Sequence, residues 1–260
     1  MTGFAQVLAD GTPAPNGLTV DIPETWLQGR TAYGGFSSAL ALAVATQVGG
    51  EGLPPLRSAQ LAMIAPLYGT VTASAQVLRQ GRNATWIETR IADDKGTGFV
   101  GNFVFMGPVP SSLAFDDRPL PDGLVSLEQA QPLPIEYAAS FVRNNFEAQV
   151  ALPPESSRRE VCWWVRLRDR APLHPMVELM LCADATPPGV MPQFDRTLQV
   201  SSMHWQMNLL SPAPMTRDGW WLLHAIGDYA RDGCSSQHMA VWNTQGEPLA
   251  TGTQSIALFG

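Results

Sequence analysis

The amino-acid sequence predicts an α+β fold made of two similar units, in each of which an antiparallel sheet wraps around a central helix. Three observations support this fold class. The chain contains an internal repeat, it has two helical segments that are apolar nearly all round, and strand-like runs follow each of them. Repetition over such a length indicates two copies of one supersecondary unit that pack on each other. We therefore expect the two units to lie side by side, with the sheet of one continuous with the sheet of the other.

The repeat is clearest near the C-terminus. Residues 253–260 (Thr-Gln-Ser-Ile-Ala-Leu-Phe-Gly) align with residues 100–107 (Val-Gly-Asn-Phe-Val-Phe-Met-Gly). In this alignment Gln254 takes the place of Gly101, so the two copies differ in their polar chemistry. A duplicated scaffold needs an active site in only one half, and the difference points to the second.

The first unit begins with a short strand at residues 17–23, which Pro23 ends. Residues 34–47 follow, opened by two glycines and rich in Ala and Leu, and their apolar character is typical of a buried helix. Residues 86–91 alternate between apolar and polar, as a half-buried antiparallel strand does. Four strands are expected after the helix, at residues 57–65, 70–79, 84–92 and 98–106.

Residues 108–144 contain six prolines with acidic and polar residues between them, which predicts a linker over the surface. The chain is therefore divided into an N-terminal domain (1–107), the linker, and a C-terminal domain (145–260). In the second domain a helix is expected at residues 175–184, with Pro175 in the first turn, where proline is tolerated. Its strands are expected at residues 146–152, 160–167, 197–208, 219–228, 234–243 and 248–259.

Composition limits the classes of partner. The net charge of −7 and the isoelectric point of about 5.0 argue against nucleic acid as the main partner. Hydrophobic residues make up 45% of the chain but charged residues only 15%, which favours an oligomeric interface or an apolar substrate groove. Interfaces are enriched in aromatic residues, so we expect a homodimer or larger homo-oligomer. Four tryptophans on strands support this: Trp163, Trp164, Trp220 and Trp221.

The sequence indicates a cytoplasmic protein. Residues 1–11 lack the basic start and apolar core of a secretion signal, and the longest apolar stretch, residues 39–48, is too short for a membrane span. Cys162, Cys182 and Cys234 are odd in number and lack metal-ligand spacing, so they are interpreted as buried thiols in a reducing compartment. No metal and no cofactor are expected.

The cationic positions have two interpretations. They are Arg158, Arg159, Arg166, Arg168 and Arg170. Arg166 and Arg168 share one face of a predicted strand, where they either bind phosphates or form a solvated strand face. The second interpretation is favoured.

Three polar residues of the second unit stand out against apolar neighbours. Asp184 ends an apolar helix, where it meets the negative end of the helix dipole and loses solvation, so it has a function or caps a neighbour. Ser202 lies on a predicted strand whose residues 202, 204 and 206 are expected to share one face, and alone it is interpreted as structural. Gln254 lies in the last predicted strand, where it is interpreted either as an exposed polar residue or as a site residue.

In order and spacing, these positions resemble the acyl-CoA thioesterase II family of double hotdog proteins. The resemblance covers nearly the whole chain and implies a double hotdog fold, an acyl-CoA substrate, a role in lipid metabolism, and catalytic roles for Asp184, Ser202 and Gln254. The segments that carry it are Gly34-Gly35, Leu78-Arg79-Gln80-Gly81, Pro121-Asp122-Gly123-Leu124, His174 with Ala183-Asp184, Leu198-Gln199-Val200-Ser201-Ser202 and Thr253-Gln254.

One run departs from the family pattern and leaves two alternatives open. The family has Asp-His-Ser-Met-Trp-Phe after its catalytic Thr or Ser, whereas this chain has His204-Trp205-Gln206-Met207-Asn208-Leu209. His204 thus replaces an acid. The first alternative is a hotdog enoyl-CoA hydratase or dehydratase, which uses a His and an Asp. The second is an acyl-CoA-binding protein without turnover.

The residues suit thioester hydrolysis. A thiol with a pKa near ~8.5 leaves readily as thiolate, so a serine–histidine pair is not required. Asp184 is expected to accept a proton from water, and Ser202 and Gln254 to fix that water by hydrogen bonds. Backbone N–H groups of Gly34 and Gly35 are expected to hold the carbonyl oxygen. We therefore expect the helix of one unit to serve the catalytic residues of the other.

Overall fold

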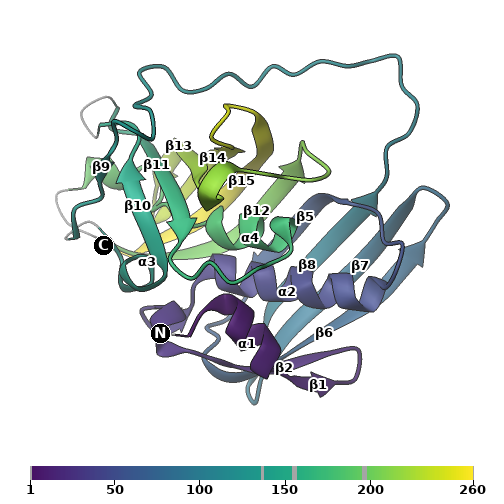
Figure 1. Ribbon diagram of the computed structural model, residues 1–260. Coiled ribbons are helices and arrows are strands. Elements are labelled where there is room, and N and C mark those ends of the chain that lie inside the picture. The colour runs from purple at the N-terminus through teal and green to yellow at the C-terminus, as the bar shows by residue number, and fades with distance from the viewer. Residues whose placement is uncertain (1, 136–137, 154–156, 195–197, 260) are drawn as a thin grey trace.

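A computed structural model of the chain describes residues 2–135, 138–153, 157–194 and 198–259. Within these residues one antiparallel sheet of 13 strands runs through both halves, in the order β1-β2-β6-β7-β8-β5-β12-β15-β14-β13-β11-β10-β9. A small two-stranded sheet pairs β3 with β4. Figure 1 shows the sheet curving around helices on one side. Residue 197 and Gly260, the ends of two predicted segments, lie outside the described residues.

The elements of the N-terminal half are α1 (Phe4–Asp10), β1 (Thr12–Ala14), β2 (Gly17–Ile22), η1 (Glu24–Trp26), β3 (Leu27–Gln28), β4 (Thr31–Ala32), α2 (Gly34–Gly49), β5 (Leu56–Met63), β6 (Gly69–Gln80), β7 (Ala84–Asp93) and β8 (Gly96–Met106). Those of the C-terminal half are β9 (Gln131–Pro132), α3 (Ser140–Asn145), β10 (Phe146–Val150), β11 (Glu160–Leu167), α4 (Pro175–Cys182), η3 (Met191–Gln193), β12 (Gln199–Leu209), η4 (Arg217–Gly219), β13 (Trp221–Arg231), β14 (Cys234–Trp242) and β15 (Pro248–Phe259).

The duplication predicted from the sequence is present in the fold. The series β2-α2-β5-β6-β7-β8 recurs as β11-α4-β12-β13-β14-β15. The halves join where β5 pairs with β12, with Leu61 opposite Trp205. The predicted sheet continuity is therefore confirmed, and both predicted helices and all the predicted strands occur within a few residues of their expected ends. The sequence did not predict α1, α3 or the shortest strands.

The helices lie on the concave side of the sheet because their apolar surfaces need cover. The α2 residues from Gly35 to Leu42 are all buried, as are the residues of α4 except its first and Glu178. The two helices pack against each other across the junction of the halves (Figure 1). Alternation along β7 places Ile87 and Ile91 beneath α2 while Arg90 is exposed. The core is thus shared between the halves.

The connection between β8 and β9 crosses the outside of the molecule from one half to the other (Figure 1). Its first part, residues 109–120, is exposed, and two indole N–H groups attach the connection, one near the end of this part and one beyond it. Trp164 Nε1 donates to the carbonyl oxygen of Val125 at 3.0 Å, and Trp242 Nε1 to that of Arg118 at 3.2 Å. The predicted linker range also contains β9 and all of α3 except its last residue. The domain boundaries stay a prediction.

The structure differs from the sequence-based expectations for the four tryptophans and for one cysteine. The tryptophans expected at an oligomer interface are all covered by the chain itself: Trp163, Trp164, Trp220 and Trp221. Trp163 and Trp221 pack in the main core, whereas Trp164 on β11 and Trp220, which directly precedes β13, pack in a second cluster with residues 124–130. Cys162 and Cys182 are buried as expected, but the expectation for Cys234 is wrong: it is exposed, because it begins β14 directly after the turn at Gly233.

Candidate active site

Asp184, Ser202 and Gln254 meet at one point of the concave surface, although they come from three elements. Asp184 follows the end of α4, Ser202 lies on β12 and Gln254 on β15. Gln254 Nε2 donates to Oδ1 of Asp184 and to Oγ of Ser202, each at 2.9 Å. Both hydrogens of the amide are thereby used. The convergence of the three side chains that the sequence predicted is confirmed, whereas their catalytic role stays a prediction.

Ser202 reaches this point through a β-bulge, and the expectation that residues 202, 204 and 206 share a face is wrong. The register of β12 against β15 shifts between Ser202 and His204. The extra residue, Met203, reverses the alternation, because side chains in a strand change face at every residue. Ser202 therefore faces inward like Trp205, and His204 is exposed.

The position of His204 bears on the hydratase hypothesis and on the effect of the replaced acid on the site. It replaces an acid of the family pattern, but it lies on the outer face, away from the three converging residues. The hydratase or dehydratase hypothesis required His204 beside Ser202 and so loses its basis. The departure from the family pattern leaves the network of Asp184, Ser202 and Gln254 intact.

The start of α2 brings the N-terminal half against the acid of the C-terminal half. A Cβ atom on Gly34 would lie 2.5 Å from Oδ2 of Asp184, and one on Gly35 would lie 2.6 Å from the carbonyl oxygen of Leu181. Neither position has room for a side chain, so the close approach of the two helices requires glycine. As expected, the helix of one half reaches the polar residues of the other.

Burial raises the pKa of Asp184 to about 7, although the hydrogen bond from Gln254 and the backbone N–H of Gly35 both lower it. The residue is only 9% exposed. Desolvation dominates because a carboxylate loses more hydration than two donors restore. A carboxyl group with a pKa near 7 is matched to accept a proton at neutral pH. Since the Gly35 N–H faces the acid, the expected role of Gly34 and Gly35 toward a substrate carbonyl stays a prediction.

Tyr33 connects the two helices at the site. Its side chain is fully buried, it stacks on Phe141 with ring centroids 4.3 Å apart, and its Oη donates to the carbonyl oxygen of Leu181 at 2.9 Å. This carbonyl is one of the last four of α4, which have no partner within the helix. Burial and the nearby Asp184 raise the pKa of Tyr33, so its hydroxyl stays a donor.

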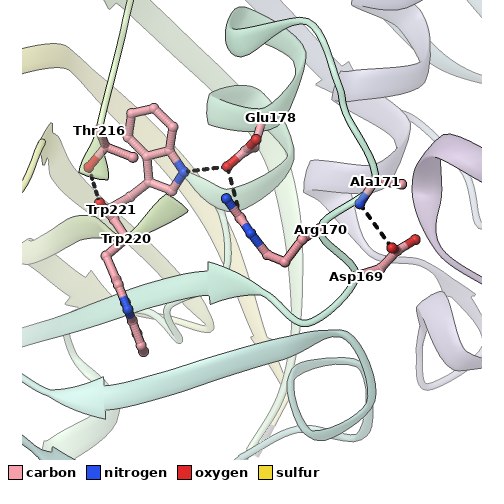
Figure 2. Close-up of polar contacts among 7 residues, drawn as sticks. All are labelled: Asp169, Arg170, Ala171, Glu178, Thr216, Trp220 and Trp221. Atoms are coloured by element: carbon pink, nitrogen blue, oxygen red, sulfur yellow. Dashed lines mark hydrogen bonds and ion pairs between the residues drawn. The ribbon is translucent and has the colours of Figure 1, made fainter. Parts of the chain in front are cut away.

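The other end of α4 is attached to the sheet by Glu178, a residue that the sequence analysis missed. Its Oε1 accepts from Trp221 Nε1 at 3.3 Å and from Arg170 Nη1 at 3.4 Å (Figure 2). His174 Nδ1 accepts from the N–H of Met176 and caps the start of the helix. Glu178 is the only charged residue in α4, which is the sequence signal that marks it. These contacts fix the position of α4 and therefore that of Asp184, which follows its end.

The arginines of β11 and the segment after it have partners within the protein. Arg166 pairs with Glu147 at 2.8 Å and lies over the ring of Trp220. Arg168 Nε donates to the carbonyl oxygen of Arg143 at 3.2 Å. These contacts favour a structural strand face over a phosphate site. Among the described residues, no cluster of three His, Cys, Asp or Glu side chains is arranged for a metal, and no helix has the length and apolarity to cross a membrane.

Comparison with protein families identifies the class. The family model of the acyl-CoA thioesterase C-terminal domain matches residues 121–258, and that of the N-terminal domain matches residues 22–106. The first match alone spans more than half of the chain. The protein belongs to the acyl-CoA thioesterase family and is a thioester hydrolase. No curated protein sequence matches significantly.

Solved structures of similar fold agree along almost the whole chain. A putative thioesterase II from Thermobifida fusca YX is 18% identical, with a TM-score of 0.83 over 100% of this chain and 98% of its own. A protein of unknown function with a hot dog fold from Alicyclobacillus acidocaldarius is 16% identical, with a TM-score of 0.86 over 100% and 99%. A putative thioesterase from Novosphingobium aromaticivorans DSM 12444 is 22% identical, with a TM-score of 0.81 over 96% and 98%. These likenesses establish the fold, a double hot dog.

The raised pKa of Asp184 predicts a pH-dependent effect of Asp184→Asn on stability. Between the ordinary pKa of 3.8 and about 7 the folded chain keeps a proton that the unfolded chain has lost, so stability falls as pH rises through this range. Relative to the wild type, the variant should therefore gain on the order of 4 kcal/mol between pH 4 and pH 8. Urea unfolding of both proteins at several pH values measures it. A difference that stays constant with pH contradicts the shift.

Proposed function

We propose that this protein cleaves acyl-CoA thioesters to the free acid and CoA with a water molecule activated by Asp184, Ser202 and Gln254. The observation that carries the proposal is the amide of Gln254, which binds the acid and the hydroxyl at the same time. The site is buried but reaches the surface, because Gly34, Met63 and Ser202 are partly exposed. A thioester carbonyl meets the acid there.

In this mechanism Asp184 accepts a proton from water while the water oxygen forms a bond to the thioester carbonyl carbon. The carbonyl π electrons move onto its oxygen, for which the backbone N–H of Gly34 at the start of α2 is the proposed donor. Collapse of this intermediate restores the carbonyl and breaks the C–S bond. The thiolate leaves without a proton at first, because a thiol is a good leaving group, and Asp184 then returns the proton to solvent or product.

Gln254 and Ser202 position the water. Because Gln254 Nε2 donates to Ser202 Oγ, the hydroxyl hydrogen of Ser202 is directed elsewhere, toward a water or the substrate. The same amide holds the Asp184 carboxyl group in one orientation. An acid held beside a fixed water needs little reorganisation on the way to the transition state.

Turnover of a panel of acetyl-, hexanoyl- and palmitoyl-CoA, followed by thiol release, tests the proposal. Asp184→Asn should lower kcat by roughly 10²–10⁴-fold with little change in KM, because it removes the proton acceptor and keeps the shape. Gln254→Ala and Ser202→Ala should lower kcat less. His204→Ala, on the outer face of the same strand, is the matched control and should keep the wild-type rate.

Three outcomes would contradict the proposal. Wild-type protein that binds the panel without releasing thiol is a binding protein, the second function left open by the sequence. Asp184→Asn with wild-type turnover removes the assignment of the base. Addition of water to an enoyl-CoA without thiol release identifies a hydratase instead.

We also propose a role in lipid metabolism and a cytoplasmic location. The buried, unpaired thiols of Cys162 and Cys182 support the location.

We further propose a homodimeric or larger assembly. The burial of the tryptophans removes one argument for assembly, but exposed apolar side chains supply another. Ile64, Tyr68 and Leu78 of the N-terminal half are 59%, 45% and 52% exposed. Light scattering at micromolar concentration should give at least twice the 28.1 kDa mass of one chain. The mass of one chain contradicts assembly.

A further inference from the structure

A second buried glutamine, Gln237 on β14, lies directly behind Gln254. The two residues are opposite each other in the pairing of β14 with β15, and Gln237 is 3% exposed. Gln237 Nε2 donates to Oε1 of Gln254 at 2.7 Å, and its own Oε1 accepts from the backbone N–H of Gly189 at 2.8 Å. One continuous chain of hydrogen bonds thus runs from the N–H of Gly189 through Gln237 and Gln254 to Asp184 and Ser202.

The direction of this chain is determined at its backbone end. An amide side chain can present either its oxygen or its nitrogen to a neighbour, but the N–H of Gly189 can only donate. The oxygen of Gln237 must therefore face Gly189, which turns its nitrogen toward Gln254. Gln254 must then present its oxygen to Gln237 and its nitrogen to Asp184 and Ser202. Reversal at Gln254 would place a carbonyl oxygen against the carboxyl group of Asp184.

Gly189 itself is held in place. A Cβ atom there would lie 2.6 Å from the backbone N of Gly227 and 2.9 Å from the carbonyl oxygen of Arg159. Its backbone therefore packs directly on β13, where the N–H of Gly227 donates to the carbonyl oxygen of Arg159 at 2.8 Å. The chain of hydrogen bonds therefore starts from a turn that packs closely on the sheet.

The N-terminal half provides an internal comparison. On its paired strands, Gly101 of β8 lies opposite Leu61 of β5 and Thr89 of β7. Gln254 of β15 lies between the corresponding partners, Trp205 and Gln237. Thr89 is as deeply buried as Gln237, but its hydroxyl donates to the carbonyl oxygen of Ala41 in α2 and to no second side chain. At these corresponding strand positions, the half that holds the acid has the paired glutamines and the other half has Gly101 and Thr89.

We propose that Gln237 is a positioning residue for the hydrolysis: it anchors the amide of Gln254 to Gly189 and so keeps both Gln254 N–H groups directed at Asp184 and Ser202. The proposal rests on the proposed function, because it assigns to Gln237 an effect on the water-activating residues. Gln237 does not touch these two residues and acts only through Gln254.

Two substitutions of Gln237 with different chemistry test this role. Gln237→Met keeps the size but gives Gln254 no donor, so the amide can reverse. We expect kcat to fall by roughly 10- to 100-fold with little change in KM. The acidic limb of the pH–rate profile should move to higher pH, because Asp184 loses a donor that stabilises its charged form.

Gln237→Glu separates positioning from packing. Its carboxyl group still accepts from Gly189, and when protonated it still donates to Gln254. On ionisation it can only accept, so Gln254 must turn its nitrogen away from Asp184. We expect kcat near the wild-type value at low pH and an alkaline limb that the wild type lacks. This comparison is made within one folded variant, so it holds even if Gln237→Met does not fold.

Thr89→Val is the matched control, because it removes a buried polar group at the corresponding strand position of the other half. It should keep the wild-type pH profile. Wild-type kcat and pH limbs in both Gln237 variants overturn the inference, as does an equal shift of the limbs in Thr89→Val. Failure of the proposed function is recognised separately, by absent thiol release in the wild type or unchanged turnover in Asp184→Asn.

Discussion

A carboxyl group buried at the junction of the two halves is the constraint on which the site depends. Asp184 is desolvated by the packing of α2 against α4, and its remaining partners are the amide of Gln254 and the backbone of Gly35. Burial alone disfavours the charged form, and the two donors restore part of its stability. The pKa of about 7 is the balance between them. A more open site would lower the pKa of this acid, and an entirely apolar one would keep it protonated.

The duplicated fold explains why a half without the acid is retained. The N-terminal half supplies the glycines at the start of α2, which permit a helix to approach Asp184, and Tyr33, which bonds to the last turn of α4. The C-terminal half supplies the acid, the hydroxyl and both glutamines. Glu178 fixes α4 to β13 at the far end (Figure 2). Neither half forms the site alone, because Asp184 of the C-terminal half accepts from the backbone N–H of Gly35 in the N-terminal half.

The sequence predicted the regular parts of this structure and the identity of the three converging residues, since apolar helices, strand alternation and the repeat are local signals. It could not predict the bulge at Met203, because one extra residue leaves no mark in an alternating pattern until the partner strand is known. Gln237 was missed because its importance comes from lying opposite Gln254. The tryptophans were misjudged because the same aromatic residues suit an interface and a surface covered by the protein's own connection.

The most direct test of this account is the titration of the Asp184 carboxyl group by NMR. Protein labelled with ¹³C at aspartate carboxyl carbons gives one resonance per residue, and the signal missing from Asp184→Asn identifies Asp184. The account predicts a midpoint near 7, set by burial against the donation from Gln254 and Gly35. A midpoint near the ordinary value of 3.8 would show a solvated carboxylate and would contradict the buried acid on which the site depends.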